Sequence, residues 1–587
     1  MSHDDASSRR LKAKLLISFR KLKLSHNNFL ALMAIVVGYL TALGAWVFIQ
    51  GIHTLENFSF SLIDKLPSPW LFPLVPAFGM VLCSQIIYWF AREAKGHGVP
   101  EVIYSILVQN GIMRTRVAFA KLCATILCLG TLGSAGREGP IVLIGSAIGS
   151  GLGQFLELPR NAIKVLVGCG AAAGIAATFN APIGGVVFAL EVIMHTFAPR
   201  IFTPIIISSV VSAVTFHSIA GSHYSFHFSF HYKELPIEIL GFVFIGMLCG
   251  VMATFFTYSW HSMDKFFEKL TWPSYIKALI GGLLVGLVVV FYRELGGNAY
   301  GLIKTLAAGT DDYFIGTLIL LLALKLLATI ITISCGGSGG IFAPSLVMGA
   351  IVGALVHSII APFFPVSEVG VYVIVGMAAF VSGSTHGPVA VILVLCEMSN
   401  NYELMLPLMA GCIVATIIAR RLSDVNIYTI KLKDRGIYLK DGHDLDILKT
   451  YHVFDLMEVK LPVVETSTPL QEAFSKLQET HHSYCLVKDE DDVVVGLISY
   501  NETISKIISK KLTLDITSVE AMHISDDFVY ETDHMTIPYD KFLRTESEYL
   551  KVLNKDMIFV GLILKKDLMR SYRKALHGKS ISLTQGH

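Results

Sequence analysis

The chain has 587 residues, of which 53% are hydrophobic and 16% are charged, and its mean hydropathy is +0.60. Soluble domains carry about 25% charged residues, so the low charged fraction excludes a chain built of several soluble domains. It indicates a protein that folds largely in lipid. The nine cysteines form no CxxC pair and no ligand spacing with histidine, so neither a metal site nor a disulfide framework is indicated. The net charge of +2 is less informative than its distribution along the chain.

The first 28 residues are basic, with seven lysines and arginines against Asp4 and Asp5. By the positive-inside rule, this end is expected in the cytoplasm. A cleaved signal peptide is the alternative for a basic start followed by an apolar run. No small-residue cleavage site closes the run at 29–49, and further apolar segments follow, so we favour a membrane span.

Apolar segments of two kinds continue to about residue 433. Some approach or exceed the roughly 20 residues that cross a hydrocarbon core, namely 29–49, 70–90, 237–258, 276–291, 314–333 and 404–419. Others are short and broken by glycine and proline, namely 140–156, 162–179, 182–194, 342–360 and 388–396. Short, interrupted segments are typical of discontinuous helices that meet near the bilayer midplane.

The segments form an internal repeat. A proline is followed at the same spacings of 5 and 9 residues by two glycines in each half, and a later proline precedes a glutamate by nine residues. The matched residues are Pro140, Gly145, Gly149, Gly168, Pro182 and Glu191 in one half and Pro344, Gly349, Gly353, Gly376, Pro388 and Glu397 in the other. A glycine-rich string precedes each first proline, GSAGREGP at 133–140 and GGSGGIFAP at 336–344. We therefore predict two copies of one membrane module, at about 29–220 and 236–420.

The first glycine-rich string is a candidate anion site. Its glycines free the backbone, and Pro140 suits the first turn of a new helix. A helix that begins inside the membrane presents unpaired N–H groups and a partial positive charge, which bind an anion without a lysine. Glu138 lies at this helix start, and we interpret it as a tethered competitor of the anion that leaves when it is protonated. The alternative is a carboxylate that only stabilises the helix N-terminus. Arg137 either neutralises Glu138 or lines an access path.

The second string repeats this construction. Gly339 and Gly340 allow close approach, so the N–H groups of Ile341 and Phe342 are expected to point at the same anion. The alternative is a flexible loop, but the apolar sequence directly after the glycines is atypical of a solvated loop. For Glu191 and Glu397, which end paired apolar helices, a structural role in holding backbone amides is favoured over a role in the ion path.

The remaining region, 434–587, is more charged and alternates polar and apolar residues. A strand, an acidic turn and a strand are predicted at 483–499, preceded by an amphipathic helix. The pattern recurs at 549–564, where the tetrapeptide VGLI repeats 65 residues after its first occurrence. We predict a cytoplasmic α+β region of two similar units.

These strings resemble those of the CLC family of chloride channels and proton-coupled chloride exchangers. The resemblance rests on GREGP at 136–140, GGIFAP at 339–344, FNAPIGGVVFALE at 179–191, GHGVPEV at 96–102, and GMAAF and PVAVILVLCEM within 376–398. The region after 434 resembles the tandem CBS domains that many CLC proteins carry. The likeness covers about 29–570.

The resemblance implies an all-α polytopic membrane domain of two inverted repeats, at 29–433, followed by the small CBS-like domain. It implies a homodimer in the lipid bilayer, each subunit with its own chloride pathway, and no enzymatic activity, cofactor, metal or nucleic-acid partner. The expected location is the plasma (inner) membrane with both termini in the cytoplasm. Glu138 is the implied gate, and the implied anion-binding residues are His97, Gly136, Arg137, Gly139, Gly340, Ile341, Phe342 and Tyr428.

Two positions depart from the family pattern. His97 stands where the family usually has a serine, and because imidazole becomes cationic near pH 6.5, we hypothesise that its protonation tightens anion binding. Val192 stands where exchangers usually carry an internal proton-transfer glutamate. Because valine carries no proton, a passive channel is favoured. A proton-coupled chloride antiporter is the alternative, and transport of another anion, such as fluoride or nitrate, is a further one.

The CBS-like units carry an incomplete adenine-nucleotide motif. Ser499 in the first unit and Asp567 in the second match the residues that hold the ribose, but neither unit has the full set. A purely structural or dimerising region is at least as well supported. Two rival classes are a membrane receptor with a nucleotide-sensing domain and a cation transporter, and neither requires paired glycine-rich strings.

Overall fold

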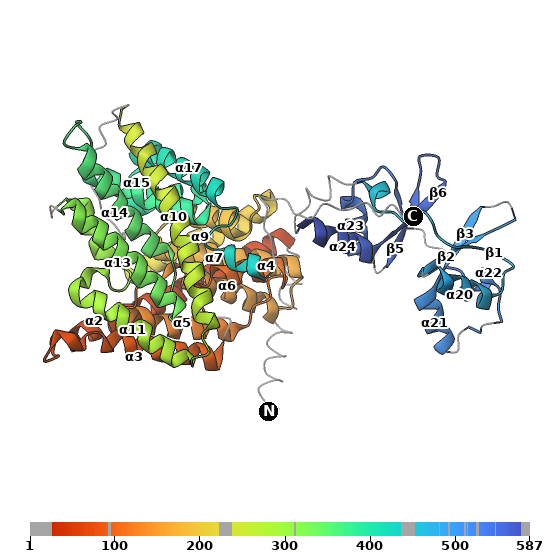
Figure 1. Cartoon of the computed structure of the whole chain (residues 1–587), viewed down its shortest axis with the longest axis horizontal. Helices are drawn as coiled ribbons and strands as arrows, with labels where there is room; N and C mark the ends of the chain where they lie inside the picture. The colour runs from red at the N-terminus through yellow and green to blue at the C-terminus, as the bar shows by residue number, and fades with distance from the viewer. Residues whose placement is uncertain are drawn as a thin grey trace. The chain divides into compact units, whose positions relative to one another are not determined.

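The computed structural model describes residues 26–91, 95–221, 237–309, 313–435 and 452–576, the last range with gaps at 481, 491–492, 510–511, 514, 524–526 and 546. Most of the basic segment at 1–28 therefore lies outside the described residues. The chain divides into two compact units, Met1–Ile437 and Tyr438–His587. In Figure 1 the helical unit runs in colour from red to cyan, and the strand-containing unit is blue.

The first unit is all-helical in its described part. Its first half contains α2 (His26–Asp64), α3 (Leu74–Phe90), α4 (Val99–Leu107), α5 (Thr115–Gly130), α6 (Glu138–Phe155), α7 (Arg160–Phe179), α8 (Pro182–Phe188) with the π-helical turn Ala189–Ile193, and α9 (Pro199–Ala220). Its second half contains α10 (Glu238–Lys269), α11 (Ser274–Phe291), α12 (Tyr300–Ala308), α13 (Ile315–Ser334), α14 (Phe342–Ile360), α15 (Val369–Thr385), α16 (Pro388–Ser399), α17 (Met405–Leu422) and α18 (Ile430–Asp434).

Long and short apolar helices are both present, as predicted, but two segments predicted to be short, 162–179 and 342–360, belong to helices of 20 and 19 residues that are long enough to cross a membrane. Among the described residues, nine helices are long and apolar enough to cross a membrane, and three shorter apolar segments, Pro182–Ile193, Val369–Thr385 and Pro388–Ser399, accompany them. Helices α2 and α10 extend beyond the predicted spans, to 39 and 32 residues. The additional turns carry charged residues such as Asp64 and Lys269, which place helix ends outside the apolar layer. The polytopic helical fold is confirmed.

The internal repeat is visible in the packing of α6 on α7 and of α14 on α15. A Cβ atom on Gly145 would lie 2.2 Å from the carbonyl oxygen of Gly170, and one on Gly349 would lie 2.2 Å from that of Gly376. Such backbone contact requires glycine. The structural counterpart of Gly376 is therefore Gly170. The predicted match to Gly168 is wrong by two residues, because Gly168 faces Met194 on another side of α7.

The second unit contains two similar three-stranded sheets. They are β1 (Val463–Glu465), β2 (Tyr484–Lys488) and β3 (Val494–Ser499), and β4 (Phe528–Tyr530), β5 (Tyr549–Leu553) and β6 (Phe559–Leu564). In each sheet the first pair is parallel and the second antiparallel, and the pairs Val487↔Gly496 and Val552↔Gly561 have the same register. The helices are α20 (Leu470–Glu479), α21 (Tyr500–Ile508), α22 (Ser518–Ala521), α23 (Thr536–Arg544) and α24 (Lys565–Leu576). The predicted α+β duplication is confirmed.

Candidate functional site

The two glycine-rich strings, 204 residues apart along the chain, are bonded to each other. The N–H of Gly136 donates to the carbonyl of Gly340 over 2.7 Å, and the N–H of Gly340 donates to the carbonyl of Gly136 over 2.6 Å. A third loop joins them through a parallel bridge between Gly96 and Ser338. A Cβ atom on Gly139 would lie 2.2 Å from the carbonyl oxygen of His97, so only glycine permits this approach.

Three helices begin where these loops meet. Helix α4 starts at Val99, α6 at Glu138 and α14 at Phe342, each directly after one of the loops. Among the described residues, no side chain caps any of these three helix starts. Their first N–H groups therefore lack the usual capping acceptor, and each start carries a partial positive charge. This arrangement suits a small anion.

The carboxylate of Glu138 is buried near two of these helix starts, those of α6 and α14. Its side chain is 1% exposed, and Oε1 accepts a hydrogen bond from the hydroxyl of Tyr300 over 2.5 Å. Oε2 has no partner among the described residues. A Cβ atom on Gly136 would lie 2.3 Å from this Oε2 and 3.1 Å from the backbone nitrogen of Ala343, which locates the carboxylate beside the start of α14.

Ile341 and Phe342, predicted to supply N–H groups, are 1% and 3% exposed. The ring of Phe342 packs against Phe179, with centroids 5.5 Å apart, and against Phe188 at 6.3 Å. Helices α7 and α8 of the first half thus hold the start of α14 in the second half. Arg137 is close to Glu138, with Nε 3.9 Å from Oε1.

His97 and Tyr428 meet on another side of the loops. Their ring centroids are 5.5 Å apart, and His97 also packs edge-on against Trp260 at 5.0 Å. His97 is 2% exposed, and neither ring nitrogen has a partner among the described residues. Asn426 orients Tyr428, since its Oδ1 accepts the N–H of Tyr428 over 2.9 Å while its Nδ2 donates to Thr385 over 2.7 Å.

Two buried lysines that the sequence analysis missed hold the loops in place. Lys121 donates to the carbonyl of Gly96, and Lys325 donates to the carbonyls of Leu295 and Gly297 over 3.0 and 3.2 Å. Both lysines are 0% exposed. Each precedes its repeat proline by 19 residues, so comparing the two halves position by position would have found them.

Two hydroxyl pairs cross between the halves in the same way. Thr125 bonds Ser338 over 2.9 Å, and Ser134 bonds Thr329 over 3.0 Å. Each pair joins the helix before one glycine-rich string to the string of the other half. These two bonds hold both strings, while the lysines hold the loops at Gly96 and at Leu295 and Gly297.

Glu191 and Glu397 also cross between the halves and hold backbone amides, as predicted. Glu397 accepts the N–H groups of Ile183 and Gly184, at the start of α8, over 3.0 and 2.7 Å. Glu191 accepts those of Val389 and Ala390, at the start of α16, over 3.4 and 2.7 Å. The neighbouring Val192 is 3% exposed and faces Gly387.

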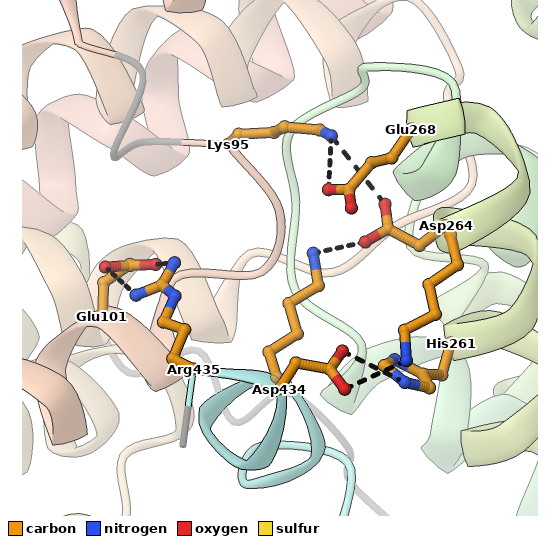
Figure 2. A network of polar contacts seen from close by, with 9 residues as sticks. Lys95, Glu101, His261, Asp264, Glu268, Asp434 and Arg435 are labelled. Atoms are coloured by element: carbon orange, nitrogen blue, oxygen red, sulfur yellow. Dashed lines mark hydrogen bonds and ion pairs between the residues drawn. The ribbon is translucent and has the colours of Figure 1, made fainter. Parts of the chain in front are cut away.

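A cavity of about 850 Å³ reaches the site and is lined in part by His97, Gly98 and Leu143. Figure 2 shows the ion pairs on its walls. Asp264 binds Lys431 over 2.6 Å, and Asp434 binds Lys265 over 3.0 Å and faces His261 at 3.3 Å. These pairs attach α18 to α10. The guanidinium of Arg435 binds Glu101 of α4 through two bonds of 2.6 and 3.2 Å, a pairing that raises the pKa of Arg435.

The second unit contains the two residues predicted to contact an adenine nucleotide, Ser499 and Asp567. The hydroxyl of Ser499 already accepts the N–H of Glu502 at the start of α21. Burial and the carboxylates of Glu548, Glu502 and Glu458 raise the pKa of Tyr484 to about 12. Burial and the carboxylate of Asp567 raise the pKa of Glu458. Lys566 and His482 act on the pKa of Glu458 in the opposite direction, so acidic and basic groups both lie near Asp567.

Most of the chain is similar to proteins of one known family. Residues 78–420 match the family model described as "Voltage gated chloride channel", and residues 453–509 match that of the CBS domain. The chain is 30% identical over 412 residues to the H(+)/Cl(-) exchange transporter ClcA of Vibrio cholerae, covering 68% of this chain and 87% of the relative. It is 27% identical to the voltage-gated ClC-type chloride channel ClcB of Citrobacter koseri, covering 68% and 97%.

Solved structures show the same likeness. A slow cyanobacterial Cl-/H+ antiporter matches with a TM-score of 0.63 and 26% identity, covering 70% of this chain and 98% of the other. A eukaryotic CLC transporter matches with a TM-score of 0.64 and 18% identity, covering 92% and 99%, which shows a shared fold.

Proposed function

The chain belongs to the CLC family of voltage-gated chloride channels and transports anions across a membrane, and from this premise we propose that it is a passive, Glu138-gated chloride channel. The observation that carries the proposal is the position of the Glu138 carboxylate, buried beside the start of α14 with Oε2 unpartnered among the described residues. A negative side chain occupies the place that suits a negative ion. Chloride enters when the carboxylate leaves, and protonation of the carboxylate favours its departure.

Replacing Glu138 tests the gate directly. Glu138→Gln keeps the shape of the side chain and removes its charge, so we expect faster chloride efflux from liposomes and loss of activation by acid. Glu403→Gln is a matched control, because Glu403 is an exposed glutamate at the start of the turn before α17. Wild-type rate and wild-type pH dependence in Glu138→Gln would refute the gate.

We assign the anion contacts to backbone N–H groups at the start of α6 and α14, where Gly136, Arg137, Gly139, Gly340, Ile341 and Phe342 lie. His97 and Tyr428 are assigned to the cavity side of the same pathway, because both are buried where their rings meet. A phenol donates one hydrogen bond, and a protonated imidazole donates two and adds a positive charge. Burial of the ring and the charges of Lys431 and Lys121 oppose this protonation, so chloride affinity should rise only toward the acid end of the range from about pH 8 to about pH 5, and His97→Ser should abolish this rise. An unchanged profile in His97→Ser would remove His97 from the site.

Passive conduction is supported by two adjacent residues within the π-helical turn Ala189–Ile193, Glu191 and Val192. Val192 carries no proton, and both oxygens of Glu191 accept backbone N–H groups of α16. Neither residue is thus free to relay protons toward Glu138. In liposomes with a chloride gradient and an internal pH dye, we expect chloride flux without uphill proton movement. Stoichiometric proton pumping would refute the channel.

Proton-coupled antiport is the second candidate, because a relative at 30% identity and a solved structure at 26% identity bear exchanger names. The same liposome assay separates the two functions. Repeating it with fluoride and nitrate in place of chloride tests the further alternative of another anion.

Three other proposals concern assembly, location and the second unit. We propose a homodimer with a separate pathway in each subunit, tested by mass measurement in detergent. We propose a plasma-membrane (inner-membrane) location with both termini in the cytoplasm, tested by labelling cysteines placed at either end in intact cells. We also propose that no cofactor binds and that Ser499 and Asp567 hold no adenine nucleotide. Saturable heat from ATP or AMP in calorimetry on the whole protein would refute this last proposal.

A further inference from the structure

Tyr300 makes a contact with Glu138 that the family resemblance did not suggest. Its hydroxyl donates to Oε1 of Glu138 over 2.5 Å, across 162 residues of sequence. Hydrogen bonds from a hydroxyl to a carboxylate are short and about twice as strong as neutral ones. Among the described residues it is the side-chain hydrogen bond that the Glu138 carboxylate accepts.

The loop before α12 presents Tyr300 to Glu138 in one orientation. Lys325 holds this loop by its bonds to Leu295 and Gly297, and Gly297 also donates its N–H to Leu132 over 3.3 Å. Gly297 and Ala299 both adopt positive φ values, 58° and 57°, and the chain turns sharply into the helix there. Tyr300 is the first residue of that helix.

Arg137 completes the arrangement. Its guanidinium lies over the ring of Tyr300 at 5.5 Å, and its Nε is 3.9 Å from Oε1 of Glu138. One cation thus contacts both partners of the hydrogen bond. The charge of Arg137 favours the ionised carboxylate, and the ring of Tyr300 is fixed between a helix start and a cation.

We propose that Tyr300 is a positioning residue that holds the ionised Glu138 carboxylate in the anion site and so sets how often the pathway is blocked. The inference rests on the proposed gating by Glu138. For chloride to enter, the bond from Tyr300 to Oε1 must break. Protonation of Glu138 removes the charge that makes this bond strong, so the same event weakens the restraint and neutralises the competitor.

The test is Tyr300→Phe, which removes one hydroxyl and keeps the ring beneath Arg137. Chloride efflux from liposomes should be about tenfold faster than wild type at about pH 7.5, which corresponds to about 1.4 kcal/mol. The difference should shrink to little or nothing at about pH 3.5, where a free glutamic acid is largely protonated. Tyr313→Phe is the matched control, because Tyr313 also bonds a glutamate, Glu294, but in an exposed position. This control should keep the wild-type rate.

The double variant Tyr300→Phe/Glu138→Gln separates the two proposals. If Glu138→Gln accelerates efflux and adding Tyr300→Phe changes nothing further, the restraint acts through Glu138. If Glu138→Gln accelerates efflux but Tyr300→Phe behaves as wild type, the role of Tyr300 is overturned while the gate stands. If Glu138→Gln itself has no effect, the gate is overturned.

A binding measurement guards against a fold defect. Chloride calorimetry in detergent at about pH 7.5 should show about tenfold tighter binding to Tyr300→Phe, because the competing carboxylate is less firmly held. If Tyr300→Phe does not fold, Tyr300→Met, which also lacks the hydroxyl, takes its place in both assays. Unchanged or weaker chloride affinity in a folded variant overturns the inference.

Discussion

The glutamates that cross between the two halves give a quantitative prediction. Glu397 accepts two backbone N–H groups over 3.0 and 2.7 Å, whereas one of the two bonds to Glu191 is longer, at 3.4 Å. A hydrogen bond to a charged group contributes about 1.5–3 kcal/mol. Both carboxylates are only partly buried, so solvent screening reduces this value. We expect Glu397→Ala to cost about 2–3 kcal/mol and Glu191→Ala about 1–2 kcal/mol.

Unfolding of the purified protein by increasing SDS in mixed micelles measures these costs. Glu403→Ala is the control, because Glu403 is exposed and close in sequence to Glu397. The expected order of stability is control, Glu191→Ala, Glu397→Ala. Equal stability of all three would refute the argument from hydrogen bonds. Loss of transport in Glu191→Gln at unchanged stability would instead place Glu191 in the ion path.

Three further predictions follow from other features. Gly349→Ala should lower the free energy of unfolding by about 3 kcal/mol or more in the same SDS assay, because its Cβ would lie 2.2 Å from the Gly376 carbonyl oxygen. Gly316→Ala, with open space around it, is the control and should be nearly neutral. Equal effects of the two substitutions would contradict the close packing of α14 on α15. Asp264→Asn should release the ammonium group of Lys431 and raise chloride flux about twofold at low ionic strength. At about 1 M salt the variant and the wild type should have the same flux, because salt screens the charge. A change in flux that does not depend on salt would exclude an electrostatic cause. Burial and Asp567 raise the pKa of Glu458, so the ionised form of Glu458 opposes folding above that pKa. In urea or thermal unfolding, Glu458→Gln should therefore stabilise the protein by less than about 1 kcal/mol near pH 8 and not near pH 4. The control is Glu472→Gln, on the exposed face of α20, which should show no such difference between the two pH values.

The repeat and its two glycine-rich strings could be predicted because glycine and proline are required by the backbone conformation at their own positions. A glycine at a backbone contact and a proline in a first helical turn keep their spacing in any copy of the module. The same logic placed Glu138 and Phe342 at helix starts, where α6 and α14 begin, while the anion contacts of the Ile341 and Phe342 N–H groups stay a prediction. It was wrong for Gly168, because glycines two residues apart on α7 face different neighbours.

The contacts of Tyr300 and Lys325 could not be predicted from local pattern. Each depends on how a loop folds back across the molecule, and a tyrosine or lysine in an apolar stretch has no spacing that reveals its partner. For Lys325 and Lys121, the shared distance of 19 residues from the repeat prolines was a usable signal. The partners of Lys325, the carbonyls of Leu295 and Gly297, still required the three-dimensional structure.

The crossed glutamates also have a consequence for biogenesis. The amides at the start of α8 emerge from the ribosome well before Glu397, which lies 213 and 214 residues beyond its two partners. At about 5–20 residues per second, the translocon delivers that carboxylate roughly 10–40 s later. Until then the N–H groups at the start of α8 lack their carboxylate acceptor. When the second module is inserted, Glu397 accepts these N–H groups, and Glu191 of the first module accepts those at the start of α16. Each half of the nascent protein therefore supplies hydrogen-bond acceptors that the other half needs to complete its fold.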